Sequence, residues 1–215
     1  QMCIRDRFDV YTSDYLRSTI AWLGHYGASV ILMSATLPPH KRKELVEAYS
    51  WGDMPEGEQG YPLITVATAE EIHVTSVEPS PTNLVGEIQI LDEEGRPLPV
   101  LLDELLDDGG CALVICNTIG RAQATYSRLS EMYGECVELH HAGFVAWERV
   151  KKEDSLRKEL GPDSHRGAGR PWRKIVVATQ VAEQSLDIDA DVLITDIAPI
   201  DLLIQRIGRL HRHAR

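Results

Sequence analysis

Short apolar runs that stop at polar residues recur along this chain, and they limit the possible folds more than any other feature. Runs of this kind are typical of strands that are buried on both faces of a parallel sheet. Patterns with a helical period lie between them, at residues 8–26, 40–49 and 100–106. The alternation predicts an α/β fold in which helices flank a parallel sheet. The strand-like runs are Ser29–Met33, Cys111–Cys116, Val137–His141, Ile175–Ala178 and Val192–Thr195.

The composition is that of an ordinary globular protein, with 43% hydrophobic and 26% charged residues. No stretch approaches the roughly 18 apolar residues that a membrane-spanning helix needs, so no membrane segment is expected. The first residues, QMCIRDR, lack the apolar core of a signal peptide, and the cytoplasm is therefore the expected compartment. The four cysteines form no C-x-x-C pair, so we expect reduced thiols and no metal site.

The formal charge of −11 would argue against a nucleic-acid partner if it were spread evenly. Acidic residues dominate from 87 to 108, where Arg96 is the only base. From 147 to 215, Lys and Arg slightly outnumber Asp and Glu, and the basic residues cluster. This distribution suits a protein with a local phosphate-binding groove better than a protein that coats DNA.

Three arginines recur at intervals of three in the segment Gln205–Arg212. If this segment is helical, Arg206, Arg209 and Arg212 share one face and form a row of permanent charges. Like charges in a row repel each other, so the pattern favours an anionic ligand. The alternative is a solvated basic helix end, which the helix dipole favours.

Hydroxyl side chains follow two of the predicted strands. Ser34 and Thr36 come after the first strand, and Pro38 then prevents further ladder pairing, so both hydroxyls are expected to face the next layer. An ordinary strand-to-loop turn would give the same pattern. Thr118 follows the second strand and either caps the next helix or holds a nucleic-acid phosphate together with that helix N-terminus.

Two segments rich in glycine and proline interrupt the pattern. Residues 51–98 contain only short β-like runs and are expected to connect two α/β lobes. Residues 161–171 are expected to form a mobile surface loop, from which Arg166 or Arg170 contacts a phosphate in one interpretation. The β-like runs of the connector are Leu63–Val66 and Leu84–Leu91.

Four segments resemble, in order, the third, fourth, fifth and sixth motifs of superfamily-two nucleic-acid helicases. Their order, and above all the sequences of Gln184–Asp187 and Arg209–His213, resembles the helicase portion of the type I CRISPR-associated helicase-nuclease. The resemblance covers almost all of residues 8–215. The four segments are Ser34–Pro38, Asn117–Ala122, Ala178–Asp189 and Gln205–Arg212.

The resemblance implies a RecA-like α/β fold with a parallel sheet flanked by helices. Residues 99–215 would form a complete second helicase lobe, and residues 8–50 the C-terminal part of a first lobe. Residues 51–98 would be the strand-containing connector between them. Residues 1–7 have no counterpart in the resemblance and are expected to be foreign or disordered.

The resemblance also implies an activity. Proteins of this kind bind ATP and Mg²⁺ between two lobes and move along single-stranded DNA from 3′ to 5′ during CRISPR interference, a form of antiviral defence. The CRISPR RNA-guided surveillance complex recruits them, and an amino-terminal HD nuclease domain cuts the displaced strand.

Residue roles follow from the matched motifs. Arg209 and Arg212 would be arginine fingers on the γ-phosphate, and Arg206 would bind on the nucleotide side and tie the lobes together. The other residues expected on the nucleotide side are the catalytic Gln205 and the cofactor-binding Asp187, Ser34 and Thr36. The residues expected to contact DNA are Thr118, Arg121, Thr179 and Gln180.

Two parts of the implied nucleotide site are missing from the sequence. There is no G-x-x-x-x-G-K-[ST] to surround the phosphates and no D-E-x-H to hold Mg²⁺. We therefore expect a fragment that hydrolyses no ATP by itself and that lacks the HD domain. Two alternatives remain: part of a superfamily-two DNA or RNA helicase outside CRISPR, or a non-catalytic RecA-like module that binds nucleic acid.

Overall fold

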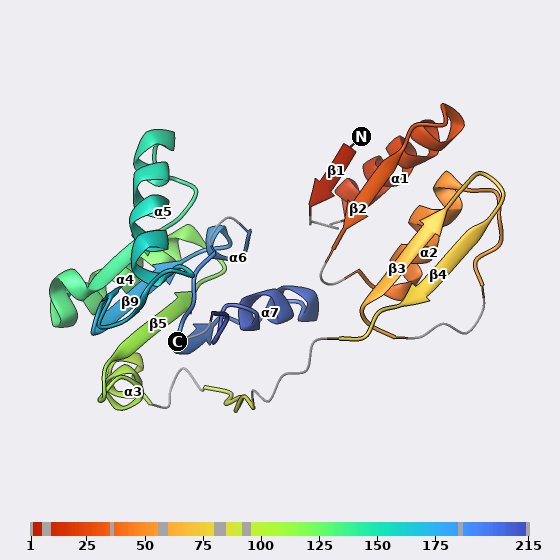
Figure 1. Cartoon of the computed structure of the whole chain (residues 1–215). Helices are drawn as coiled ribbons and strands as arrows, with labels where there is room; N and C mark the ends of the chain where they lie inside the picture. Colours follow the sequence, from red (N-terminus) through yellow and green to blue (C-terminus); the bar gives the residue numbers. More distant parts are fainter. Residues whose placement is uncertain are drawn as a thin grey trace. The chain divides into compact units, whose positions relative to one another are not determined.

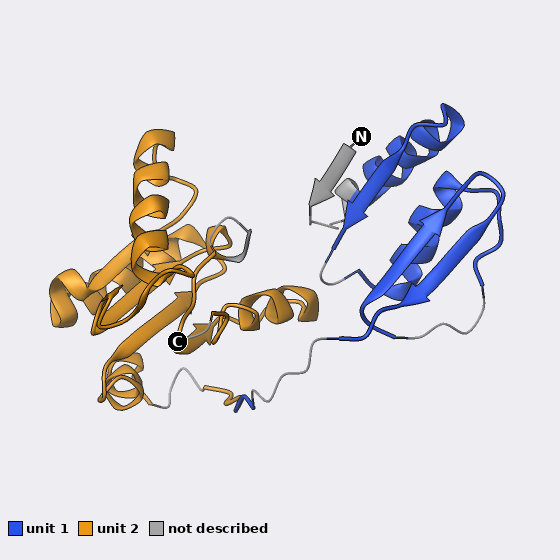
Figure 2. Ribbon diagram, viewed as in Figure 1, with its two compact units in different colours: residues 1–87 blue, residues 88–215 orange. Residues whose placement is uncertain are grey.

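The chain forms two compact units, residues 1–87 and residues 88–215 (Figure 2). The computed structural model describes residues 2–5, 10–34, 37–55, 60–79, 85–91, 96–184 and 187–213. Thr36, one of the residues predicted on the nucleotide side, lies outside the described residues.

Unit 1 combines a parallel strand pair, two helices and a β-hairpin. The helices α1 and α2 pack through the buried side chains of Leu16, Ile20 and Leu45. Met2–Arg5 pair in parallel with β2, whose edge offers unpaired backbone groups. That residues 1–7 are foreign to the protein stays a prediction. The elements are β1 (Met2–Arg5), α1 (Val10–His25), β2 (Val30–Met33), α2 (Pro39–Tyr49), β3 (Leu63–Ala67) and β4 (Ile72–Ser76).

Unit 2 is built on a four-stranded parallel sheet with the order β10-β5-β9-β6. Figure 1 labels its two central strands, β5 and β9. All residues of β5 and the last four of β9 are buried, as expected for central strands covered on both faces. The elements are α3 (Leu98–Leu105), β5 (Gly110–Ile115), α4 (Ile119–Tyr133), η1 (Gly134–Cys136), β6 (Val137–His140), α5 (Ala146–Leu160), β7 (His165–Arg166), β8 (Gly169–Arg170), β9 (Arg173–Ala178), α6 (Val181–Gln184), β10 (Val192–Thr195) and α7 (Ile200–Ile207).

Helices cover both faces of this sheet. Leu102 of α3 and Leu129 of α4 belong to the hydrophobic cluster on one face. Leu156 and Leu160 of α5 belong to the cluster on the opposite face. Alternate residues of β5 and β9 supply the two clusters, because successive side chains of a strand point to opposite sides.

The prediction of a parallel sheet flanked by helices is confirmed, and each of the five strand-like runs contains a strand. One local prediction is wrong and another is right only in part. Residues 85–91 form neither helix nor strand. Most of the segment 161–171 is exposed, as expected, but it holds β7 and β8, and Arg170 is only 8% exposed because it pairs with acidic residues inside the unit. That burial removes Arg170 from contact with a phosphate.

A group of charged side chains joins the edge strand β6 to its neighbours. The carboxylate of Glu138 lies 2.9 Å from His140 Nε2, 2.8 Å from Lys174 Nζ and 3.7 Å from Lys152 Nζ. Lys174 also contacts Glu159 at 2.7 Å. Burial alone would raise the pKa of Glu138, but hydrogen bonds with His140 and Lys174 outweigh it and lower the pKa to about 2.

The substitution Glu138→Gln is expected to lower the free energy of unfolding by about 3 kcal/mol at pH 7. The folded pKa lies below the ordinary value of 4.5, so the carboxylate stabilises the fold above that pH, and the stabilisation is lost as the pH falls toward 2. Denaturant unfolding at several pH values measures the difference. The exposed Glu131 of α4 gives a matched control, Glu131→Gln. A wild-type advantage that stays constant between pH 7 and pH 3 would contradict the prediction.

Candidate functional site

Polar residues of unit 2 gather where the parallel strands end. Asn117 and Thr118 follow β5, Thr179 and Gln180 follow β9, and Asp196 follows β10. The backbone ladder continues past the strands, since Asp196 N–H donates to the carbonyl of residue 115 at 3.0 Å and Thr179 N–H to that of residue 140 at 3.1 Å. The sheet therefore places three of the predicted DNA-side residues, Thr118, Thr179 and Gln180, at a single edge, and the fourth, Arg121 of α4, contacts Asp196 there.

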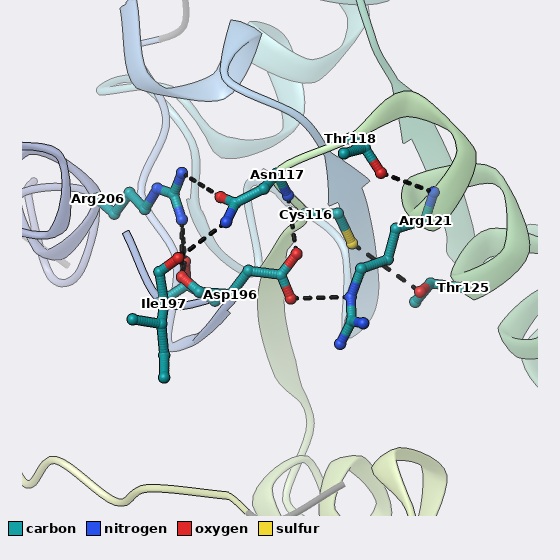
Figure 3. Close-up of polar contacts among 9 residues, drawn as sticks. Cys116, Asn117, Thr118, Arg121, Thr125, Asp196, Ile197 and Arg206 are labelled. Carbon is teal, nitrogen blue, oxygen red and sulfur yellow. Dashed lines mark hydrogen bonds and ion pairs between the residues drawn. The ribbon is translucent and has the colours of Figure 1, made fainter. Parts of the chain in front are cut away.

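Arg206 of α7 is buried at this edge, with 1% exposure (Figure 3). Its Nη1 donates to Thr195 Oγ1 at 2.5 Å and to the Asp196 carbonyl at 3.0 Å. Its Nη2 donates to Asn117 Oδ1 at 3.0 Å. Arg206 therefore links α7 to the ends of β10 and β5 within unit 2.

Asp196 links the same strand ends to α4. Its Oδ2 accepts a hydrogen bond from Asn117 N–H at 2.8 Å, and its Oδ1 lies 2.9 Å from Arg121 Nε (Figure 3). Asn117 Nδ2 donates to the carbonyl of Ile197 at 2.8 Å. The predicted contact residue Arg121 is thus held by a carboxylate in this structure.

Thr118 caps α4. Its Oγ1 accepts a hydrogen bond from Arg121 N–H at 3.2 Å, and its backbone is extended, as in other N-cap residues. The capping interpretation is confirmed. The side chain is also exposed, so a role in ligand binding stays a prediction.

The two predicted residues after β9 differ in accessibility. Thr179 is only 2% exposed, because it continues the ladder of a central strand. At this exposure the hydroxyl is hardly accessible, and a contact between Thr179 and DNA stays a prediction. Gln180 is partly exposed, and its Nε2 donates to the carbonyl of Asn117 at 3.0 Å.

The prediction of one helical row of arginines is wrong. The helix α7 ends at Ile207, and the chain then turns at Gly208. Arg206 and Arg209 are buried, whereas Arg212 is exposed. After the turn the backbone runs beside Ala190, whose N–H donates to the Arg209 carbonyl at 2.9 Å. Only Arg206 of the three arginines lies on the helix.

Arg212 and Asp187, both predicted on the nucleotide side, lie together. Arg212 Nε is 2.7 Å from Asp187 Oδ1, and His213 Nε2 is 3.3 Å from the same oxygen. The side chain of Arg212 is 42% exposed. Gln205 is partly exposed on α7, and Arg209 is 8% exposed. Arg212 is therefore the most accessible of the three arginines predicted on the nucleotide side.

A buried ion pair fixes the backbone of this segment. Asp189 Oδ1 accepts a hydrogen bond from Arg212 N–H at 2.7 Å, and its Oδ2 lies 3.7 Å from Arg170 Nη1. Arg170 Nη2 contacts Asp191 Oδ2 at 3.0 Å. Asp189 and Arg170 are both buried, so the position of Arg212 depends on a rigid internal contact.

Ser34 lies in unit 1, directly after β2, and is partly exposed. It lines a cavity of about 570 Å³ whose other walls come from β2, α2, β3 and Ile20 of α1. The other residues predicted to bind nucleotide or DNA, as far as the structure describes them, belong to unit 2.

Sequence reasoning missed Asn117, Thr195 and Asp196 as site residues. Each lies at or directly after the end of a predicted strand, which is a usable signal for a parallel sheet. Cys116, beside them, is a buried free thiol, and burial raises its pKa. A raised pKa disfavours the reactive thiolate.

In the part of the chain that the structure describes, no helix is long and apolar enough to cross a membrane. No three His, Cys, Asp or Glu side chains are grouped there as the ligands of a metal ion would be.

Comparison with known proteins identifies similar chains. The family model for the C-terminal part of the CRISPR-associated nuclease/helicase Cas3 matches residues 108–215. The CRISPR-associated nuclease/helicase Cas3 of Streptococcus thermophilus is 43% identical over 96% of this chain, which corresponds to 23% of that protein. The chain therefore spans about a quarter of the length of the curated relatives it matches.

Solved structures are also similar to this chain. The crystal structure of T. fusca Cas3-ATP matches with a TM-score of 0.79 and 30% identity, over 98% of this chain and 27% of that one. A chain of the CRISPR RNA-guided surveillance complex, pre-nicking, matches with a TM-score of 0.76 and 28% identity, over 98% of this chain and 28% of that one.

Proposed function

Because this chain belongs to the CRISPR-associated nuclease/helicase Cas3 family, we propose that it forms part of an ATP-driven motor that moves along single-stranded DNA from 3′ to 5′. The family expected from the sequence is confirmed. We assign residues 99–215 to the second RecA-like lobe, residues 8–50 to the end of the first lobe and residues 51–98 to the connector. The observation that supports the motor most directly is the gathering of polar residues at one edge of the parallel sheet.

We assign the DNA-facing role to the accessible residues of that edge. Thr118 and Arg121 are exposed at the start of α4, and Gln180 is partly exposed after β9. Hydroxyl, amide and guanidinium groups are the side chains that most often bind nucleic-acid phosphates, and they position the strand without selecting its sequence. Such contacts suit an enzyme that moves along DNA of any sequence.

We assign the nucleotide-facing role to the segment after α7. Arg212 is accessible and lies against Asp187, and Gln205 and Arg209 are close in sequence. When ATP and Mg²⁺ are bound, they supply the phosphoryl group and neutralise its charge. The part of this chain would be to bring guanidinium groups to the γ-phosphate, where a planar, always charged group binds oxygens bidentately. Arg209 must leave its buried position before it can take part.

We propose a different role for Arg206 from the one the sequence suggested. Its guanidinium donates to three acceptors inside unit 2, so a nucleotide or the first lobe would have to displace these bonds. We therefore assign Arg206 the role of holding α7 against the strand ends.

We propose the CRISPR RNA-guided surveillance complex as the partner of the whole protein, supported by the similarity to a chain of such a complex. An HD nuclease activity would belong to a part of the protein outside this chain. The alternative, a non-catalytic module, predicts salt-dependent DNA binding that nucleotide does not change.

Variants of Thr118 test the DNA-facing edge. Both Asp and Asn are good N-cap residues, so Thr118→Asp and Thr118→Asn should keep α4 stable. Only the aspartate places a negative charge where a phosphate would bind. We expect Thr118→Asp to bind a single-stranded oligonucleotide about tenfold more weakly than Thr118→Asn, a difference of about 1.4 kcal/mol.

Fluorescence anisotropy with a labelled oligonucleotide measures this difference, and thermal unfolding checks that both variants fold. Glu131→Asp, on an exposed position of the same helix, controls for the general effect of an altered acidic residue. Equal affinities of the two Thr118 variants would show that this residue is only a cap.

A further inference from the structure

The ion pair between Arg121 and Asp196 joins two residues of unequal freedom. Arg121 Nε lies 2.9 Å from Asp196 Oδ1, with side-chain exposures of 52% and 19% (Figure 3). Arg121 is a long side chain on the first turn of α4, and it can swing toward solvent without changing the backbone.

Asp196 is held from several sides. Its Oδ2 accepts a hydrogen bond from Asn117 N–H at 2.8 Å, and its carbonyl accepts one from the buried Arg206 at 3.0 Å. Its own N–H donates to the carbonyl of Ile115 at 3.0 Å. The carboxylate is therefore a fixed negative charge at the end of β10, and Arg121 is the mobile partner.

This fixed charge lies in a groove lined mainly by basic and apolar side chains. The groove has a volume of about 970 Å³. Its basic lining residues are Arg96, Arg121 and Arg128. Asp196 is the single acidic residue in the described lining. The same groove reaches Asn117 at the end of β5. A phosphate that approaches Arg121 must therefore come close to the carboxylate of Asp196.

We infer that Asp196 competes with the nucleic-acid phosphate for Arg121 and thereby limits the affinity of this edge for DNA. The inference rests on the proposed DNA-facing role of the edge. Asp196 already pairs with Nε of Arg121 and neutralises part of its charge. A phosphate must therefore displace this carboxylate or bind a guanidinium whose charge is partly neutralised. A protein that releases and rebinds a strand at each step requires such a limited affinity at each contact.

A double-mutant cycle tests the inference. Asp196→Asn removes the charge but keeps an oxygen that can accept from Asn117 N–H. We expect it to bind a labelled single-stranded thymidine oligonucleotide at least fivefold more tightly than wild type. In the Arg121→Gln background, the same substitution should change the affinity less than twofold. The slope of log affinity against log salt should steepen by about 0.7 in Asp196→Asn, which is one additional phosphate contact.

Glu131→Gln is the matched control, because it removes one negative charge from the exposed far end of α4. Thermal unfolding establishes that each variant folds, and Asp196→Ser replaces Asp196→Asn if the latter unfolds. The inference is overturned if wild type binds DNA and neither neutral variant binds more tightly. It is also overturned if the gain persists in the Arg121→Gln background. Absence of any salt-dependent binding by wild type would instead refute the proposed DNA-facing edge itself.

Discussion

Replacing Arg212 with alanine, in a full-length protein that carries this chain, is expected to lower the rate of DNA-stimulated ATP hydrolysis by about 10³-fold or more. Phosphoryl transfer depends on positioning and on neutralising the charge of the transition state, and a guanidinium on the γ-phosphate does both. A loss of this size corresponds to at least roughly 4 kcal/mol of barrier.

The structure supports Arg212 for this role through its surroundings. Its backbone N–H is fixed by the buried Asp189 at 2.7 Å, while its guanidinium is 42% exposed and rests on Asp187. A rigid backbone and an accessible head group are what a residue needs to reach a ligand without reorganising the unit. Asp187 contacts the guanidinium at 2.7 Å, and in the proposed role a phosphate would replace this contact.

Steady-state phosphate release with saturating single-stranded DNA measures the effect. Arg212→Lys should recover only a small part of the rate, because an ammonium cannot form the bidentate contact. Arg157→Ala, an exposed arginine of α5, is the matched control. DNA affinity without nucleotide should be unchanged in Arg212→Ala. Hydrolysis within threefold of wild type would remove Arg212 from the catalytic role.

Most of the fold could be predicted because it depends on local patterns. The residues of β5 are buried on both faces, so nearly all of them are apolar, and the run stands out in the sequence. The start of α4 could be predicted in the same way, since Thr118 is a good N-cap directly after a strand.

The predicted arginine row failed for a local reason. A spacing of three places residues on one face only while the helix continues, and α7 ends at Ile207. Gly208 is a usual helix terminator, and this signal was present in the sequence. The burial of Thr179 was harder to predict, because it depends on the ladder of β9 with the strand beside it.

The contacts that hold the site together could not be predicted from the sequence, because they join residues far apart in the chain. Asn117 and Asp196 are separated by 79 positions, and Arg206 and Asn117 by 89. Arg170, in the segment that was expected to be a surface loop, pairs with Asp189 and Asp191. Each contact requires the order of strands in the sheet, which no local pattern contains.

The substitution Arg206→Met is expected to lower the free energy of unfolding of unit 2 by about 3 to 5 kcal/mol. Arg206 is 1% exposed and donates to Thr195 Oγ1, to the Asp196 carbonyl and to Asn117 Oδ1. Methionine fills similar space but donates to none of them. Polar groups that stay buried without a partner cost about 1 to 3 kcal/mol each.

A loss of this size is a large part of the free energy of unfolding of a single domain, which is about 5 to 15 kcal/mol. Denaturant unfolding of the chain, followed by circular dichroism, measures it. Arg206→Lys should be intermediate, because a lysine keeps the charge but cannot span three acceptors. Arg128→Met, at an exposed position of α4, should change the free energy by less than about 0.5 kcal/mol.

Arg206→Met and Arg206→Lys also distinguish the two roles considered for Arg206, a contact with nucleotide or the first lobe and the attachment of α7 to the strand ends. A residue that only contacts nucleotide or the first lobe would leave the unfolding of unit 2 unchanged when it is replaced, and its loss would affect hydrolysis alone. If Arg206 holds α7 to the strand ends, its replacement lowers the free energy of unfolding. Hydrolysis then falls as a consequence, because α7 leads directly into the segment that carries Arg212. Stability equal to wild type in Arg206→Met would therefore restore the nucleotide-side interpretation.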